Sequence, residues 1–239
     1  MLIIPAIDIQ GGCVVRLVQG KTDKKIYSRD PVKTAKHWVK QGAGLIHLVD
    51  LDGAFFGAPK NAGIVKEIVK NIPIPVEFGG GVRDMATIKQ MLGLGVYRVI
   101  LGTRAIQDTA FLKKAYKIFK NKIIVSLDAR DEKIVVKGWK VSSGNKNLIG
   151  FAESLKKIGF KEFIYTDTLK DGTLKGPNIK NIKALLKKTG MRIIASGGIS
   201  SLDDICRLKL LERLGLSGII IGKALYEGKF TLTQAIKIS

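Results

Sequence analysis

Two aspartates, Asp8 and Asp128, stand at the ends of two apolar runs that lie close to half the chain length apart. A pair of facing carboxylates suits acid and base catalysis, provided that their surroundings separate their pKa values so that one donates a proton and the other accepts it. A lone aspartate after a strand usually caps the next helix, but a pair related by a repeat is better explained by function. We therefore predict that both are catalytic.

Glycine-containing segments follow four further apolar runs, and they fall into two pairs. Glycine lets backbone N–H groups approach an anion closely, and the start of a helix already favours phosphate there. Tight turns alone would not explain why both segments of each pair carry glycine and open a helix. The sequence therefore predicts a ligand with a phosphate at each end. The predicted contacts are Gly80, Gly81, Arg83, Gly102 and Thr103 for one phosphate, and Gly197, Gly198, Gly222 and Lys223 for the other.

Other polar residues stand near the ends of the same apolar runs. Thr166 follows one of them and Asp171 lies in the loop beyond, so we place both at the rim of the site. For Asp50 and Asp52 a structural and a functional role are equally open. His47 lies inside an apolar run, where an imidazole that serves structure is more usual than a catalytic one.

Short β-rich runs alternate with amphipathic helical patterns along the whole chain, which is typical of βαβ units around a parallel sheet. Acidic caps predict the starts of three helices, and glycines at 42, 95, 159 and 190 mark helix ends. The predicted helices are Val32–Gln41, Met85–Leu94 and Ile205–Leu214. The predicted strands are Leu2–Ile7, Leu45–Val49, Pro75–Phe78, Arg98–Leu101, Lys122–Leu127, Glu162–Tyr165, Arg192–Ala195 and Gly218–Ile221.

The two halves of the chain repeat one another, because the aspartates and glycines named above recur in the same order about half the chain apart. Eight βα units made of two fours predict an α/β fold, a (β/α)8 barrel built from two homologous half-barrels. We expect one domain over residues 1–239, with repeats at about 1–120 and 121–239. A doubly wound fold would need a glycine-rich turn that the segment from Asp8 to Cys13 does not supply.

Composition narrows the class of protein further. The chain has 239 residues, of which 46% are hydrophobic and 26% charged, so it is a globular composition. We find no run long enough to cross a bilayer and no secretory leader, and we expect no membrane association. Cys13 and Cys206 lack zinc-ligand spacing, so we expect no metal and a reduced, cytoplasmic chain.

The chain carries 41 Lys and Arg against 20 Asp and Glu, a formal net charge of +21. Such an excess raises nucleic acid as a partner, but the lysines are spread over most predicted helices without a basic tail or interleaved aromatic residues. We therefore expect no nucleic acid partner. An alternative interpretation of the positive charge is that its field steers a doubly phosphorylated substrate toward the site.

The chain resembles the half-barrel enzymes of histidine biosynthesis, and among them the isomerases. The matching segments run in order along the whole chain: Pro5-Ala6-Ile7-Asp8, Val15-Arg16-Leu17, His47-Leu48-Val49-Asp50-Leu51-Asp52-Gly53, Gly79-Gly80-Gly81-Val82-Arg83, Ser126-Leu127-Asp128-Ala129-Arg130, Val136-Lys137-Gly138-Trp139, Asp171-Gly172-Thr173 and Ala195-Ser196-Gly197-Gly198-Ile199.

The resemblance implies an Amadori rearrangement, in which a bisphosphorylated aminoaldose becomes an aminoketose without a cofactor. It implies that Asp8 is the general base, and that Asp128 or Asp171 is the acid that opens the ribose ring. Thr166 matches a rim threonine that orients the reacting centre. Gly172 belongs to the second phosphate region, while Arg16 and Trp139 lie in long loops that close over the substrate.

Two relatives remain as alternatives. The sister barrel, the cyclase of imidazole glycerol phosphate synthase, shares both aspartates and both phosphate loops but requires a glutaminase partner. A bifunctional relative also isomerises phosphoribosyl anthranilate. The segment from Pro5 to Asp8 and the segment Lys137-Gly138-Trp139 fit the isomerase better. We expect an intramolecular aldose–ketose isomerase that acts as a monomer without an obligatory protein partner.

Overall fold

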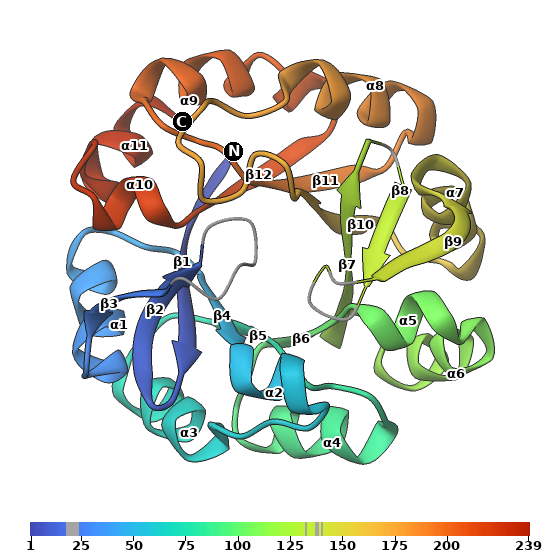
Figure 1. The fold of residues 1–239 in the computed structure, drawn as a ribbon, viewed down its shortest axis with the longest axis horizontal. Helices are drawn as coiled ribbons and strands as arrows, with labels where there is room; N and C mark the ends of the chain where they lie inside the picture. Colours follow the sequence, from blue (N-terminus) through green and yellow to red (C-terminus); the bar gives the residue numbers. More distant parts are fainter. Residues whose placement is uncertain (18–23, 132, 137–138, 140) are drawn as a thin grey trace.

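The described residues, 1–17, 24–131, 133–136, 139 and 141–239 of a computed structural model, contain the predicted ring of parallel strands surrounded by helices (Figure 1). All eight predicted strands are present, and several are longer than the sequence indicates. Their bounds are β1 (Leu2–Gln10), β4 (Ile46–Asp50), β5 (Val76–Gly79), β6 (Arg98–Leu101), β7 (Ile123–Arg130), β10 (Glu162–Asp167), β11 (Arg192–Ser196) and β12 (Leu216–Ile221).

The ring is closed by hydrogen bonding between β7 and β10, each of which also pairs with its other neighbour in the barrel. A cluster of small and branched apolar side chains fills the interior: Ile4, Ala6, Leu45, Ile100, Ile124, Ile164, Ile194 and Ile220. A second, larger cluster packs the outward faces of the strands against the helices. Burial on both faces explains why the strands appear as nearly continuous apolar runs.

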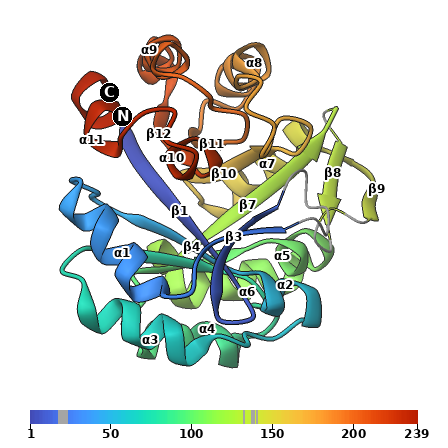
Figure 2. The ribbon, with the colours of Figure 1, turned by 60° about the vertical axis from the view of Figure 1, so that its left-hand side comes forward.

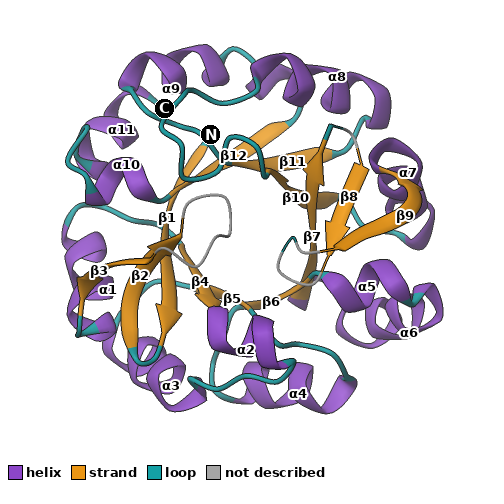
Figure 3. Cartoon of the chain, viewed as in Figure 1, coloured by secondary structure: helices purple, strands orange, loops and turns teal. Residues whose placement is uncertain are grey.

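Helices form the outer layer, and Figure 3 shows them enclosing the strands. In Figure 2, the first-half helices α3 and α4 lie on one side of the barrel and α8 and α9 on the opposite side. The bounds are α1 (Pro31–Lys40), α2 (Leu51–Phe56), α3 (Ala62–Asn71), α4 (Met85–Gly93), α5 (Thr103–Gln107), α6 (Thr109–Phe119), α7 (Leu148–Ile158), α8 (Ile179–Thr189), α9 (Leu202–Lys209), α10 (Lys223–Tyr226) and α11 (Leu232–Ile238), with 3-10 turns at Lys120–Lys122 and Glu212–Leu214.

Two of the three predicted helix starts are confirmed, because Asp30 and Asp84 accept hydrogen bonds from the backbone N–H groups of Lys33 and Thr87. The third was placed wrongly. Helix α9 begins at Leu202, since Ser201 forms a reciprocal capping box with Asp204, and the helix ends at Lys209 before a separate 3-10 turn.

Two antiparallel hairpins replace the long loops expected after the first and fifth barrel strands. The first consists of β2 (Cys13–Leu17) and β3 (Lys24–Ser28), and the second of β8 (Lys133–Val136) and β9 (Val141–Asn147). Strands β1 and β7 continue beyond the ring to pair with β2 and β8. Asp8 and Asp128 consequently lie within strands and not at their ends, which corrects the sequence-based placement.

The half-chain repeat recurs in backbone geometry. Gly80 and Gly81 have φ angles of 107° and 76°, and the corresponding Gly197 and Gly198 have 102° and 87°. A Cβ atom at Gly80 would overlap the backbone carbonyl oxygen of Asp50, and one at Gly197 would lie 2.7 Å from that of Asp167. Both positions therefore require glycine for the same two reasons, positive φ and close backbone approach.

Among the described residues, no helix is long and apolar enough to cross a membrane.

Candidate active site

Two adjoining cavities open at the ends of the barrel strands, one of about 250 Å³ and one of about 40 Å³. Side chains from all parts of the barrel border the larger one, including the two predicted catalytic aspartates. Arg16 and Asp171 border both cavities and so stand between them. Every residue that the sequence analysis assigned to the site borders at least one of the two.

Asp8 lies on β1 with Arg16 beside it. The Nη1 atom of Arg16 is 2.6 Å from Asp8 Oδ2, and its Nη2 atom donates to the backbone carbonyl of Ala6. Tyr226 supports this arrangement, since its hydroxyl also donates to Ala6 (2.9 Å) and its ring centroid lies 5.1 Å from the Arg16 guanidinium carbon. Arg16 is a cationic hydrogen-bond partner for Asp8, and a carboxylate is the form that a general base needs.

Asp128 lies on β7 and accepts two hydrogen bonds. Ser126 Oγ donates to its Oδ1 at 2.9 Å, and Trp139 Nε1 donates to its Oδ2 at 2.8 Å. Thr166 is the register partner of Asp128 on β10 and is buried. Donors to both oxygens stabilise the ionised carboxylate. Trp139 has a positive φ of 67°, and the neighbouring Lys137 and Gly138 of the predicted motif lie outside the described residues.

Asp171 is the third carboxyl group at the cavities, and its pKa is raised. Burial raises the pKa of Asp171 to about 7, and the nearby charges of Asp8 and Asp128 add to the increase while Arg16 opposes it. Desolvation is the largest of these contributions, and Asp171 lines both cavities. At neutral pH, Asp171 is therefore a carboxyl group able to donate a proton.

The two predicted phosphate regions lie in different cavities. Gly80, Gly81, Arg83, Gly102 and Thr103 border the larger cavity. Gly172, Gly197, Gly198, Gly222 and Lys223 border the smaller one, where Lys223 Nζ donates to the carbonyl oxygen of Gly172 at 3.0 Å. Each region combines backbone glycines with a cationic side chain, which suits an anionic group.

Asp50 and Asp52 prove to be structural. Asp50 is fully buried and accepts hydrogen bonds from the backbone N–H groups of Gly53, Lys60 and Asn61 and from the Asn61 side chain. Asp52 accepts from the backbone of Gly11 at 2.7 Å and so attaches the turn after β1 to helix α2. Neither residue borders the two cavities.

His47 and Ser126 border the larger cavity, although the sequence analysis gave the first a structural role and did not single out the second. Tyr226 was missed as well. The available signal for Ser126 is its position two residues before Asp128, because alternate residues of a strand point to the same side. A charged residue inside an apolar strand, such as Glu77 beside His47, is a further signal of a polar barrel interior.

The chain is similar to known proteins along nearly its whole length. The family model described as "Histidine biosynthesis protein" matches residues 2–231. The chain is 46% identical to a protein of Desulforudis audaxviator over 239 residues, covering 100% of this chain and 91% of the relative. It is 47% identical to a protein of Alkaliphilus metalliredigens over 233 residues, covering 97% of each. Both relatives are named 1-(5-phosphoribosyl)-5-((5-phosphoribosylamino)methylideneamino) imidazole-4-carboxamide isomerase.

Proposed function

The chain belongs to the histidine biosynthesis protein family, and we propose that it is the isomerase that converts phosphoribosylformimino-5-aminoimidazole carboxamide ribotide (ProFAR) into its aminoketose. The substrate named for its relatives carries two phosphoribosyl groups. The reaction is an Amadori rearrangement, in which an aminoaldose becomes an aminoketose. C2 loses a hydrogen and C1 gains one, with no net gain or loss of atoms.

One observation carries this proposal: the cavities bring three carboxyl groups together between two glycine-lined, cationic regions. A ligand with a phosphate at each end would place its central atoms beside Asp8, Asp128 and Asp171. The carboxyl groups differ in charge state, because Asp8 is paired with Arg16 whereas burial raises the pKa of Asp171 to about 7. Such a division suits acid and base catalysis.

The proton movements can be assigned on this basis. Asp171 donates a proton to the ring oxygen of the aminoaldose ribose, so that the ring opens. Asp8 then removes the proton from C2, which gives an enaminol. C1 gains a proton while the C2 hydroxyl loses one to become the carbonyl group, and this last proton replaces the one that Asp171 gave to the ring oxygen. Two donors to Asp128 favour its ionised form, so Asp171 is the better candidate for the acid, and Asp128 stabilises the cationic intermediate.

The two hairpins supply the remaining contacts in this proposal. Arg16 on β2 brings a cation to both cavities, and its Nε atom is buried without a hydrogen-bond partner among the described residues. Trp139 offers an aromatic surface beside Asp128. Thr166 helps to orient the reacting centre from β10. The cationic regions with Arg83 and Lys223 bind one phosphate each.

The proposal extends to the organisation of the protein. Residues 1–239 act as one domain of two homologous halves, as a monomer without an obligatory protein partner. The repeated glycine and aspartate geometry supports the duplication. The free thiols of Cys13 and Cys206 are consistent with a cytoplasmic location.

The test is conversion of ProFAR by the purified protein without ammonia or a glutaminase, beside the Asp8→Asn variant and with phosphoribosyl anthranilate as a parallel substrate. We expect turnover that is lost in Asp8→Asn. Turnover of the parallel substrate as well would identify a bifunctional isomerase. No turnover by folded protein would overturn the proposal, and the aminoketose with ammonia would then test the cyclase.

A further inference from the structure

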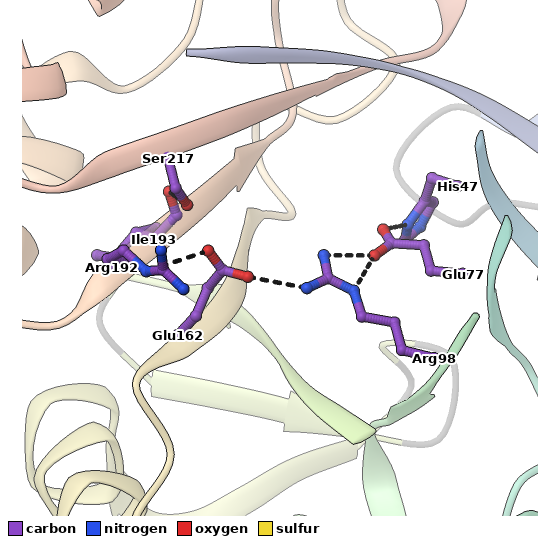
Figure 4. A network of polar contacts seen from close by, with 7 residues as sticks. All are labelled: His47, Glu77, Arg98, Glu162, Arg192, Ile193 and Ser217. Atoms are coloured by element: carbon purple, nitrogen blue, oxygen red, sulfur yellow. Dashed lines mark hydrogen bonds and ion pairs between the residues drawn. The ribbon is translucent and has the colours of Figure 1, made fainter. Parts of the chain in front are cut away.

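A chain of ionic contacts leads from the site into the barrel interior, and the proposed mechanism does not use it (Figure 4). His47 on β4 contacts Glu77 on β5, and Glu77 contacts Arg98 on β6. Arg98 then reaches Glu162 on β10 at 2.9 Å, although β7 lies between these two strands in the sheet. Glu162 finally faces Arg192, 3.6 Å away, whose side chain is largely exposed.

Glu77 is the centre of this array. Its side chain is completely buried, with Oε1 2.6 Å from His47 Nδ1 and Oε2 2.7 Å from Arg98 Nε. Burial alone would raise the pKa of Glu77, but the hydrogen bonds of His47 and Arg98 and the charge of Arg98 outweigh it and hold that pKa below its usual value. An ionised carboxylate only accepts hydrogen bonds, so His47 Nδ1 must carry the proton.

His47 lies one layer below the catalytic groups. It is the register partner of Ala6 on β1, while Asp8, two residues further on, is the partner of Val49. His47 borders the larger cavity together with Asp8 and Asp171. Since Nδ1 is committed to Glu77, Nε2 is the ring nitrogen that remains to act toward the cavity.

We propose that Glu77 is a positioning residue for the isomerisation: it fixes the tautomer and orientation of His47, so that His47 Nε2 faces the sugar as a hydrogen-bond partner for a hydroxyl group. This inference rests on the proposed function for the identity of the sugar, but the placement of the ring does not. The C2 hydroxyl must lose its proton as C2 becomes a carbonyl carbon, so a nitrogen that accepts a hydrogen bond near Asp8 assists that change.

The array supplies an internal control. Glu162→Gln removes the other carboxylate partner of Arg98 with the same chemical change, but Glu162 is two contacts away from His47. Both substitutions take a charge from the array, and both are expected to lower the melting temperature. Only Glu77→Gln alters the group that faces His47 Nδ1.

The experiment reads the ring nitrogens of His47 by ¹⁵N NMR in the wild-type protein, Glu77→Gln and Glu162→Gln. The chain contains only two histidines, and the other, His37, contacts Gln41 on the exposed side of α1, so assignment is direct.

In the wild-type protein and in Glu162→Gln, we expect a neutral ring that is protonated at Nδ1. In Glu77→Gln, we expect a mixture of tautomers, because the amide can present either its oxygen or its NH2 group to Nδ1. Kinetic assays should show kcat about tenfold lower or more in Glu77→Gln, with KM nearly unchanged, and little change in Glu162→Gln.

A second variant isolates Nε2 itself. Asparagine at position 47 keeps a donor toward Glu77 but has no atom in the place of Nε2, so His47→Asn should fold and lose kcat to a similar extent. A wild-type neutral ring protonated at Nε2, or equal kcat losses in Glu77→Gln and Glu162→Gln, would overturn the inference. Absence of wild-type turnover overturns the proposed function instead, whereas the nitrogen shifts decide the placement of the ring by themselves.

Discussion

The guanidinium of Arg16 lies 2.6 Å from the carboxylate of Asp8, so the first hairpin brings a cation to the residue that we propose as the base. The same guanidinium lies against Gly222, where a Cβ atom would come within 2.7 Å of its Cζ atom. One side chain thus connects a reacting carboxylate with a proposed phosphate region. We therefore expect Arg16 to couple binding of the substrate to the state of Asp8, the proposed base.

Replacement of Arg16 tests this coupling. We expect Arg16→Met to raise KM for ProFAR about tenfold or more, because charge-assisted hydrogen bonds to the substrate are lost. Arg213→Met, at an exposed position in a 3-10 turn, removes the same charge elsewhere and should leave KM unchanged. Steady-state kinetics of the two variants decide the matter, and an equal increase in KM for both would contradict a specific role.

The pH dependence of kcat/KM distinguishes the two candidate acids. With a pKa raised to about 7 by burial, Asp171 loses its proton as the pH rises through neutrality, so activity should fall on the alkaline side. Asp171→Asn should lose about 100-fold or more in kcat and should lack that alkaline limb. Asp128→Asn should keep it. If Asp171→Asn instead retains most of the activity, Asp128 is the acid.

The same group makes stability depend on pH. In the folded protein Asp171 keeps its proton up to about pH 7, whereas in the unfolded chain an aspartate releases it near pH 4. Between these values the folded state binds more protons, so this group lowers the free energy of unfolding as the pH rises. We therefore expect the difference in melting temperature, Asp171→Asn minus wild type, to be more positive at pH 8 than at pH 4. A constant difference at both pH values would contradict the raised pKa.

Substitutions at two equivalent positions of the repeat should lower the free energy of unfolding by different amounts. Asp50 and Asp167 are equivalent in the two halves, since their backbone carbonyl oxygens face Gly80 and Gly197. Asp50 accepts from the backbone of Gly53, Lys60 and Asn61, whereas Asp167 accepts from the Leu169 backbone and the Asn178 side chain. Because unpaired buried donors cost about 1–3 kcal/mol each, Asp50→Ala should destabilise the protein more than Asp167→Ala. Chemical denaturation of both variants measures the difference, and the reverse order would refute this interpretation.

The net charge predicts a dependence of association on salt. With a formal charge of +21 and Arg16, Arg83 and Lys223 bordering the cavities, the positive field should attract a bisphosphorylated substrate. We expect kcat/KM to fall as ionic strength rises while kcat changes little. A neutral salt series at constant pH measures this effect. Unchanged kcat/KM across the series would exclude steering.

The strands and the rim of the site were predictable because each depends on local pattern. Apolar runs with branched residues mark strands that are buried on both faces, and the repeat of Asp8, Gly80 and their counterparts marks the side on which the ligand binds. The hairpins were not predictable in this way. Arg16 and its neighbours form a strand only because β1 continues past the ring and offers them a partner.

The polar contacts inside the barrel could not be predicted from the sequence, for a different reason. Glu77, Arg98 and Glu162 each stand within or at the start of a predicted strand, but sequence does not show that Arg98 and Glu162 meet across an intervening strand. The raised pKa of Asp171 is equally non-local, since it arises from burial among groups contributed by several strands and loops. Charge states that depend on three-dimensional surroundings can be predicted only once the fold is known.

Closure of the barrel also bears on aggregation. Within the described chain, every strand of the ring is hydrogen-bonded on both sides, so the ring offers no open edge to another polypeptide. Only the outer strands of the hairpins, β3 and β9, have such an edge. Strand β3 is short, and both strands contain lysine, a residue that discourages strand addition. The two hairpins, which we propose to contact the substrate, are thus also the described segments whose sequences must resist self-association.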